Sequence, residues 1–321
     1  MSKIAFIYPG QGAQKAGMGA DFYENSEIAR YIFDQAGEEL DLDMKELCFE
    51  ENDRLDLTEY TQAAMVTTCL AMTRVAESKG LKADITAGLS LGEYPAIAAA
   101  GGMNDMDAIR LVRKRGILMQ NTVPAGEGAM CAVISMAAEE IEKVIEPIAD
   151  VSVANYNCPG QIVITGKTDA VEEAAAKLKE AGARRTIMLN VSGPFHSQML
   201  VPAGEKLAEE LEHTRFHELR IPYVTNVTAE KVTDIRETPG LLTTQISSPV
   251  RWMQSMERMI ADGVDTFVEI GPGKTLEGFL RKIDRSVKVF HISQWEDVDK
   301  VCTELADSGK MMEEACLLYT S

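Results

Sequence analysis

The sequence predicts an α/β fold: a hydrolase-like, three-layer unit with a parallel sheet and a nucleophile elbow, interrupted by a smaller ferredoxin-like unit. The first observation is a G-x-S-x-G pattern at 88–92, between a predicted strand at 83–87 and an Ala- and Ile-rich helix that runs to 100. The second is the βαββαβ order of predicted elements within 124–193, typical of a ferredoxin-like unit. We therefore expect a discontinuous large unit, 1–123 and 194–321, with 124–193 inserted into it.

Composition narrows the functional classes. The chain has 321 residues, enough to bury a sizeable core, and a formal net charge of −18 at pH 7. Such an acidic chain is not expected to bind nucleic acid or an anionic membrane surface. No apolar run approaches the roughly 18 residues that a membrane-spanning helix needs.

The start of the chain and its cysteines predict a cytoplasmic protein. Residues 1–8 hold a short apolar run without a cleavage-site pattern, so we interpret them as a first strand and not as a signal peptide. The six cysteines are scattered and form no C-x-x-C pair. This spacing is typical of free thiols in a reducing compartment, and it predicts no zinc site.

The segments before the elbow are a buried strand at 3–8, a glycine-containing turn at 9–14, and helices within 21–50 and 58–79. The turn lacks the complete G-x-G-x-x-G or Walker pattern, so it does not predict nucleotide binding. Its glycines instead allow main-chain N–H groups to approach another ligand.

The elbow at 88–92 supplies the candidate nucleophile, Ser90. Its glycines are needed because a Cβ would clash in so tight a turn. The turn raises the hydroxyl of Ser90 above the sheet. It also places the main-chain N–H of Leu91 at a helix N-terminus, where it can stabilise a developing oxyanion.

The predicted helix at 106–120 carries a cation on its apolar side. Its apolar stripe consists of Leu111, Val112, Leu118 and Met119. Arg115 falls on that stripe, whereas Arg113 and Lys114 lie off it and are expected to be solvated. A guanidinium that faces the core is costly unless it is paired. Arg115 is therefore a structural ion pair, a cation that snorkels from the stripe edge, or a binding site for a ligand carboxylate, which its planar fork suits.

The inserted unit opens at the Pro-Ala-Gly of 124–126 and closes at the Ser-Gly-Pro of 192–194. Its predicted elements are a strand at 130–134, a helix at 137–148, strands at 151–156 and 161–165, a helix at 168–181 and a strand at 185–191. The large unit then continues with helices at 202–213, 252–262 and 276–282 and strands at 221–226, 266–270 and 287–292. We expect the acidic segment from about 297 onward to be peripheral.

A serine nucleophile needs a proton acceptor, and the chain offers four histidines. His213 and His217 are separated by a predicted helix end, and His291 lies in an apolar strand, which favours a core role. His196 lies in a loop at the junction of the two units, where sites commonly form, and by elimination it is the predicted base. No acid between Ser90 and His196 stands out as a third triad member, so we expect a main-chain carbonyl to orient the histidine.

Over nearly its whole length, to about residue 295, the sequence resembles the malonyl-CoA:acyl carrier protein transacylases of fatty-acid synthesis. The motifs that carry the resemblance are Pro9-Gly10-Gln11-Gly12 with Gln14, Thr61-Gln62, Gly88 to Tyr94, Arg113 to Gln120, Asn155 to Gln161, Gly193 to Ser197, Pro249 to Trp252 and Glu269 to Lys274. One position departs from the pattern, because many relatives carry histidine before the nucleophile and this chain has Leu89.

The resemblance implies roles for the residues already singled out. Ser90 would be the nucleophile, His196 the general base and acid, and Arg115 the group that binds the malonyl carboxylate. We further expect the bulky ring of Phe195, directly before the base, to restrict substituents on the acyl α-carbon.

The resemblance also implies roles for the surroundings of the serine. The main-chain N–H groups of Gln11 and Leu91 would form the oxyanion hole. The main-chain carbonyl near Gln245 would orient the histidine in place of an aspartate. Gln62 and Asn155 would line the pocket.

The implied reaction is a two-step exchange in which Ser90 takes the malonyl group from malonyl-CoA and passes it to the phosphopantetheine thiol of acyl carrier protein. It needs neither a metal nor another cofactor, and we expect a monomer. The residues leave open an acyltransferase of polyketide synthesis or malonate decarboxylation, a serine esterase, or a non-catalytic module that binds carrier protein. The esterase alternative explains the elbow but not Arg115 on an apolar stripe.

Overall fold

The chain forms two separate sheets. A computed structural model gives the fold of residues 3–307. The larger sheet has the order β10 (Lys288–Ile292), β9 (Val264–Ile270), β1 (Lys3–Tyr8), β2 (Ile85–Gly88), β7 (Tyr223–Val224) and β8 (Lys231–Val232). The smaller sheet has the order β4 (Val151–Cys158), β5 (Gln161–Lys167), β3 (Gly128–Ile134) and β6 (Arg185–Met188).

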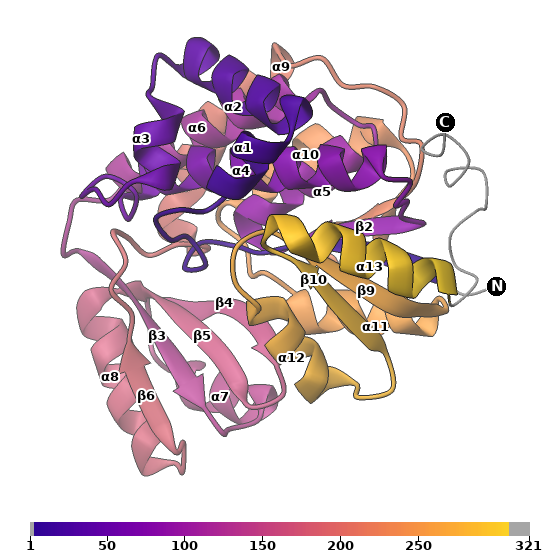
Figure 1. The fold of residues 1–321 in the computed structure, drawn as a ribbon. Helices are drawn as coiled ribbons and strands as arrows, with labels where there is room; N and C mark the ends of the chain where they lie inside the picture. Colours follow the sequence, from indigo (N-terminus) through magenta and orange to yellow (C-terminus); the bar gives the residue numbers. More distant parts are fainter. Residues whose placement is uncertain (1–2, 308–321) are drawn as a thin grey trace, which may run out of the picture.

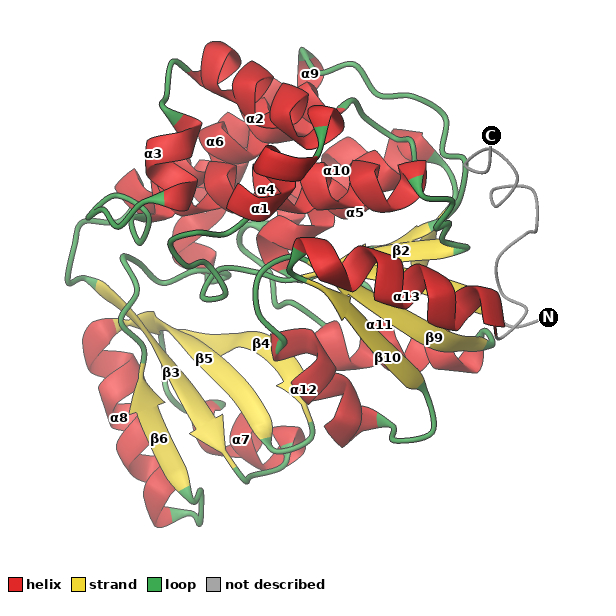
Figure 2. Ribbon diagram, in the orientation of Figure 1, coloured by secondary structure: helices red, strands yellow, loops and turns green. Residues whose placement is uncertain are grey.

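The two sheets differ in the direction of their strands (Figures 1 and 2). Neighbours in the larger sheet run parallel, except for the pair of β7 with β8. Neighbours in the smaller sheet all run antiparallel. The prediction of a mixed α/β fold with a parallel sheet and a second, separate sheet is therefore confirmed.

Helices cover both faces of the larger sheet, and Figure 1 shows the thicker helical layer above it. That layer contains α1 (Ala20–Asn25), α2 (Glu27–Leu40), α3 (Met44–Phe49), α4 (Thr58–Ser78), α5 (Glu93–Ala99), α6 (Asp105–Asn121), α9 (Val201–Glu212) and α10 (Thr238–Gln245). The opposite face packs against α11 (Trp252–Ala261) and α12 (Thr275–Ile283).

Strand β1 lies between these two layers and has a core on each side. Ile4 and Phe6 belong to the apolar cluster that includes the thicker helical layer. Ala5 and Ile7 belong to the cluster that includes Trp252 of α11. Successive side chains of a strand point to opposite faces, so a strand covered on both sides is apolar along its buried length, as this one is from Ile4 to Tyr8.

The smaller sheet is accompanied by α7 (Ala138–Ile145) and α8 (Thr168–Glu180). Its elements follow the chain in the order β3, α7, β4, β5, α8 and β6, which is the βαββαβ order expected for 124–193. An apolar cluster drawn only from residues between 131 and 183 packs within it. This unit therefore has a core separate from those of the larger sheet.

The expectation for the C-terminal segment was wrong over its described part. Residues 295–307 form a helix, α13 (Trp295–Asp307), whose Val298, Val301 and Leu305 are buried in the core beside the larger sheet. Its acidic residues had suggested a solvated segment, whereas an amphipathic helix carries charge on one side and packs with the other. The rest of that segment, 308–321, lies outside the described residues.

Two other expectations can be compared with the fold. The strand expected at 221–226 is only Tyr223–Val224, and the one expected at 185–191 ends at Met188. The cysteines of the described chain, Cys48, Cys69, Cys131, Cys158 and Cys302, are free, while Cys316 lies outside the described residues. Within 3–307, none of the helices combines the length and apolar character required to cross a bilayer.

Candidate active site

The elbow forms where β2 ends and α5 begins. Ser90 adopts a left-handed backbone, with φ of +55°, and starts a single 3₁₀ turn that leads into α5. The flanking glycines permit this, because a Cβ on Gly88 would lie 1.8 Å from the main-chain oxygen of Gly92. A Cβ on Gly92 would in turn lie 2.4 Å from the main-chain oxygen of Tyr8. The turn is therefore possible only with glycine at both positions.

Ser90 and His196, which are far apart in the sequence, meet at this turn. Ser90 Oγ lies 2.8 Å from His196 Nε2. His196 Nδ1 lies 2.9 Å from the main-chain oxygen of Gln245, at the end of α10. Since a carbonyl oxygen can only accept, Nδ1 carries the proton and Nε2 is free to accept the proton of the serine hydroxyl.

Burial makes this imidazole a neutral base. Burial, and to a lesser extent the nearby positive charge of Arg115, lower the pKa of His196 to about 4, although hydrogen bonds with the main chain at Gln245 and Ser248 act in the opposite direction. The imidazole is therefore uncharged at neutral pH.

Arg115 is fully buried in α6, and no carboxylate of the described residues forms an ion pair with it. Its Nη1 donates to Gln62 Oε1 at 2.7 Å, and its Nη2 donates to Ser90 Oγ and to Gln245 Oε1, each at 3.0 Å. Among residues 3–307, no carboxylate oxygen lies within 4.0 Å of its guanidinium nitrogens, and its Nε has no hydrogen-bond partner. Arg115 thus neither forms a structural ion pair nor reaches solvent.

Arg113 differs from its expected, solvated position. Its side chain is only 16% exposed and forms an ion pair of 3.0 Å with Glu59. Its guanidinium also lies 4.5 Å from the centre of the Tyr60 ring. The apolar stripe of α6 correctly places Arg113 on the side away from the stripe. It does not show that the start of α4 packs over that side.

A cavity of about 250 Å³ opens in front of Ser90, between the elbow and the smaller sheet. Expected site residues that line it are Gln11, Gln62, Ser90, Leu91, Asn155, Phe195 and His196. Leu89, the residue directly before the serine, lines it as well. Arg115 and Gln245 do not line it but lie behind Ser90, to which Arg115 is hydrogen-bonded.

Three polar groups at the elbow were missed by the sequence analysis. Asn226 Oδ1 accepts the main-chain N–H of Ser90 at 2.7 Å, and the Gln245 side chain donates to the main-chain oxygen of Ser90 at 3.0 Å. Glu93, fully buried, accepts from Gln245 Nε2 at 2.7 Å. The only signal for Glu93 in the sequence is a lone carboxyl group in the otherwise uncharged helix 93–99.

The acid side chains near the elbow do not form a metal site. Among residues 3–307, no three His, Cys, Asp or Glu side chains gather closely enough to hold a metal ion. The side chains that contact Ser90 directly are instead an imidazole, a guanidinium and two amides, with main-chain N–H groups at the cavity beside them. Such a set can activate a hydroxyl, hold an oxyanion and bind a carboxylate.

An elbow serine hydrogen-bonded to a histidine is the arrangement of enzymes that transfer acyl groups through serine. Comparison with known families agrees, because residues 5–300 match the acyl transferase domain family. The chain belongs to this family.

Its relatives within the family are more specific. The chain is 44% identical to the malonyl CoA-acyl carrier protein transacylase of Bacillus subtilis (strain 168), over 96% of this chain and 99% of that protein. The crystal structure of the enzyme of that name from Clostridium perfringens is 42% identical and superposes with a TM-score of 0.92, covering 96% of this chain and 98% of that one. A malonyl-transacylase solved in complex with its type II PKS acyl-carrier protein is 35% identical, with a TM-score of 0.92, covering 94% of this chain and 100% of that one.

Proposed function

We propose that this chain is a malonyltransferase that moves the malonyl group of malonyl-CoA to the thiol of acyl carrier protein, for fatty-acid synthesis, through an ester on Ser90. The names of its relatives support the donor and the acceptor. The observation that carries the proposal is Arg115, a fully buried cation without a carboxylate partner in the described chain, 3.0 Å from Ser90 Oγ.

In the first half-reaction, His196 Nε2 takes the proton of the Ser90 hydroxyl as the serine oxygen attacks the thioester carbon. The negative charge that develops on the carbonyl oxygen is held by the main-chain N–H groups of Gln11 and Leu91, both at the cavity. The carbon–sulfur bond then breaks, the CoA sulfur takes the proton back from His196, and malonyl remains on Ser90.

The second half-reaction reverses these roles with a different thiol. His196 takes the proton of the phosphopantetheine thiol, whose sulfur attacks the ester on Ser90. The serine oxygen leaves and recovers the proton from His196. Both steps balance without an oxidant, and the same imidazole acts as base and as acid in each direction.

Arg115 supplies the preference for a carboxylated acyl group. Its Nη2 donates to Ser90 Oγ and to Gln245 Oε1, and a malonyl carboxylate replaces the serine oxygen as its partner. The exchange frees the hydroxyl for attack. Gln62, which holds the other side of the guanidinium, and Asn155 and Phe195 complete the acyl pocket.

The division of the chain belongs to the same proposal. We assign 1–123 and 194–321 to a hydrolase-like unit and 124–193 to a ferredoxin-like unit inserted into it. The separate apolar core of the inserted unit supports the boundaries. We further propose that the protein is a monomer and works in the cytoplasm, a reducing compartment that suits the free cysteines of the described chain.

Intact-protein mass spectrometry after mixing with malonyl-CoA tests the function. The mass should rise by one malonyl group, and Ser90→Ala should abolish the increase. Labelling that persists in Ser90→Ala overturns the assigned nucleophile. Rapid turnover of p-nitrophenyl acetate, without transfer to carrier protein, would identify an esterase instead.

A further inference from the structure

Glu93 is a buried acid beside the reacting serine that the proposed mechanism does not use. It is the first residue of α5, and its side chain is fully buried. No hydrogen bond in the described structure joins its carboxylate to Ser90 Oγ or to His196, so it is not a triad acid. Its Oε2 instead accepts from Gln245 Nε2 at 2.7 Å and from the main-chain N–H of Asn226 at 3.1 Å.

We propose that Glu93 is a positioning residue of the acyl-transfer site, which acts by fixing the Gln245 side chain and the Asn226 main chain. The proposal rests on the malonyl transfer proposed above for the same site. In this proposal, the Glu93 carboxylate fixes the position of the Ser90 main chain and of the Arg115 guanidinium.

The Asn226 side of this arrangement holds the elbow. Asn226 Oδ1 accepts the Ser90 N–H at 2.7 Å, and Asn226 Nδ2 donates to the main-chain oxygen of Gly88 at 2.7 Å. Ser90 has a φ of +55°, a conformation that a serine keeps only when its surroundings impose it. Glu93 imposes it indirectly by holding the main chain of Asn226.

The Gln245 side holds the cation. Both hydrogens of Gln245 Nε2 are used, one to Glu93 Oε2 and one to the main-chain oxygen of Ser90 at 3.0 Å. The amide oxygen must then face Arg115, from which it accepts at 3.0 Å. Without the carboxylate, the amide could turn and present its NH₂ to the guanidinium, where donor would meet donor.

Charge adds a second consequence, because Glu93 and Arg115 face each other across the Gln245 amide. Burial raises the pKa of Glu93 to about 7, while its hydrogen bonds and the Arg115 charge act in the opposite direction. Neutralising the carboxylate leaves the arginine charge less compensated in a site of low dielectric. Arg115 should then bind the carboxylate of malonyl-CoA more tightly, although Ser90 and the guanidinium are less well positioned for the reaction.

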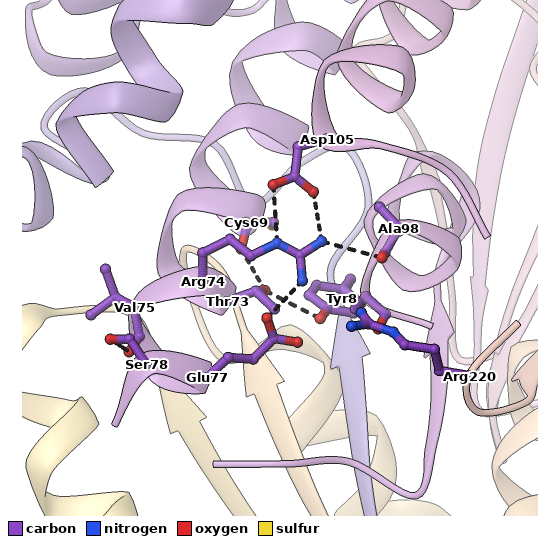
Figure 3. A network of polar contacts seen from close by, with 11 residues as sticks. Tyr8, Cys69, Thr73, Arg74, Val75, Glu77, Ser78, Ala98, Asp105 and Arg220 are labelled. Carbon is purple, nitrogen blue, oxygen red and sulfur yellow. Dashed lines mark hydrogen bonds and ion pairs between the residues drawn. The ribbon is translucent and has the colours of Figure 1, made fainter. Parts of the chain in front are cut away.

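Two variants and a matched control separate positioning from simple destabilisation. Glu93→Gln keeps an acceptor oxygen but loses the charge, and Glu93→Ala loses both. The control is Asp105→Asn, which removes a carboxylate near the opposite end of α5. Asp105 holds Arg74 at 2.6 Å, and Arg74 donates to the main-chain oxygen of Ala98, in the last turn of α5, at 3.2 Å (Figure 3). Folding of each variant is monitored by circular dichroism, and rates are expressed per folded molecule.

Positioning predicts a split between kcat and KM. Glu93→Ala should lower kcat about 10²-fold, the effect of a small misplacement of reacting groups. Glu93→Gln should lower kcat less, and should lower KM for malonyl-CoA by roughly threefold or more without changing KM for acetyl-CoA. Asp105→Asn should leave both constants unchanged.

The outcomes distinguish this inference from the proposed function. If the Glu93 variants match Asp105→Asn in kcat and KM, Glu93 is not a positioning residue and the inference is overturned. If Glu93→Ala fails to fold, the kcat and KM of Glu93→Gln alone decide the role of Glu93. Labelling of Ser90 by a fluorophosphonate needs no malonyl donor and should be slower in both Glu93 variants. A wild-type protein that reacts with this probe but not with malonyl-CoA would overturn the function, and the variant rates would still decide the role of Glu93.

Discussion

His196 Nδ1 lies 2.9 Å from the main-chain oxygen of Gln245, so the group that orients the proposed base belongs to the backbone and carries no charge. An aspartate in that position would raise the pKa of the imidazole and stabilise its protonated form. Here burial and Arg115 lower that pKa to about 4. This arrangement suits a base that must remain neutral while a cation and a substrate carboxylate lie nearby.

Replacement of His196 should slow acylation without unfolding the protein. We expect His196→Ala to lower the rate of Ser90 malonylation by roughly 10²- to 10⁴-fold, the usual contribution of a general base. Rapid-quench mass spectrometry measures the rate, and thermal unfolding checks the fold. A rate within a few-fold of the wild type would show that another group takes the proton.

The pH dependence should follow the lowered pKa. For kcat/KM with malonyl-CoA, which reports the free enzyme, we expect the loss of activity assigned to His196 near pH 4 and not near the ordinary value of about 6.5. A step near pH 7 would belong to Glu93, and Glu93→Gln should remove it. An acid limb near 6.5 that survives in Glu93→Gln would contradict the buried, cation-facing imidazole.

The same pKa predicts how stability changes with pH. Because the folded value lies below the unfolded one, the unfolded chain binds the proton first as the pH falls. The contribution of His196 to the free energy of unfolding is therefore fully present above about pH 6.5 and is lost as the pH falls toward about 4. Urea unfolding of wild type and His196→Gln should differ by an amount that changes within this window and is constant above it.

Arg115 should decide between donors. Truncating one member of a buried charge pair costs about 2–5 kcal/mol, so Arg115→Ala should lower kcat/KM for malonyl-CoA by roughly 30- to 5,000-fold. Acetyl-CoA has no carboxylate to leave unpaired, so its use should fall little or rise. Arg115→Lys should restore only part of the activity, because an ammonium lacks the planar fork.

Arg113→Ala is the matched control for this prediction. Arg113 lies on the same helix but pairs with Glu59, at 3.0 Å, and has no contact with Ser90 in the described structure. Its loss should affect both donors equally. If Arg115→Ala also lowers the use of both donors equally and destabilises the fold, its role is structural.

Phe195 should restrict branching at the acyl α-carbon. Phe195 is buried, with 6% of the residue exposed, and it lines the cavity next to His196 in the sequence. Pockets discriminate against one extra carbon by about 1–3 kcal/mol, so methylmalonyl-CoA should be a poorer donor than malonyl-CoA, by roughly 10- to 200-fold in kcat/KM. Phe195→Ala should narrow that ratio. Equal kcat/KM for malonyl-CoA and methylmalonyl-CoA in the wild type would show that Phe195 does not restrict the acyl α-carbon.

The glycines of the elbow should tolerate no side chain. Gly88→Ala places a Cβ 1.8 Å from the main-chain oxygen of Gly92, so we expect loss of folding or of the elbow. Gly278→Ala is the control, because Gly278 belongs to α12 and its added Cβ would meet no atom within 4 Å apart from its chain neighbours and the backbone of its own helix. That change should raise stability by about 0.5–1 kcal/mol in chemical denaturation. An active, stable Gly88→Ala protein would contradict the elbow geometry.

The sequence by itself determined the features that depend on local pattern. Spacing and composition alone predict the strand–turn–helix around Ser90, the βαββαβ order of 124–193 and the apolar stripe that carries Arg115. His196 was reached by elimination among four histidines, and the family resemblance pointed to Gln245. The first three features depend only on neighbouring residues. His196 could be singled out because the chain has only four histidines.

Only the tertiary structure decided what lies against each of these residues. Arg115 could have been an ion pair, and only the packing of α4, α6 and α10 around Ser90 showed that its hydrogen-bond partners among residues 3–307 are Gln62, Ser90 and Gln245. The burial of α13 and the partners of Glu93 were likewise hidden. The physical reason is that burial, and the pKa shifts it causes, depend on segments far apart in the chain, whereas periodicity reports only which side of an element is apolar.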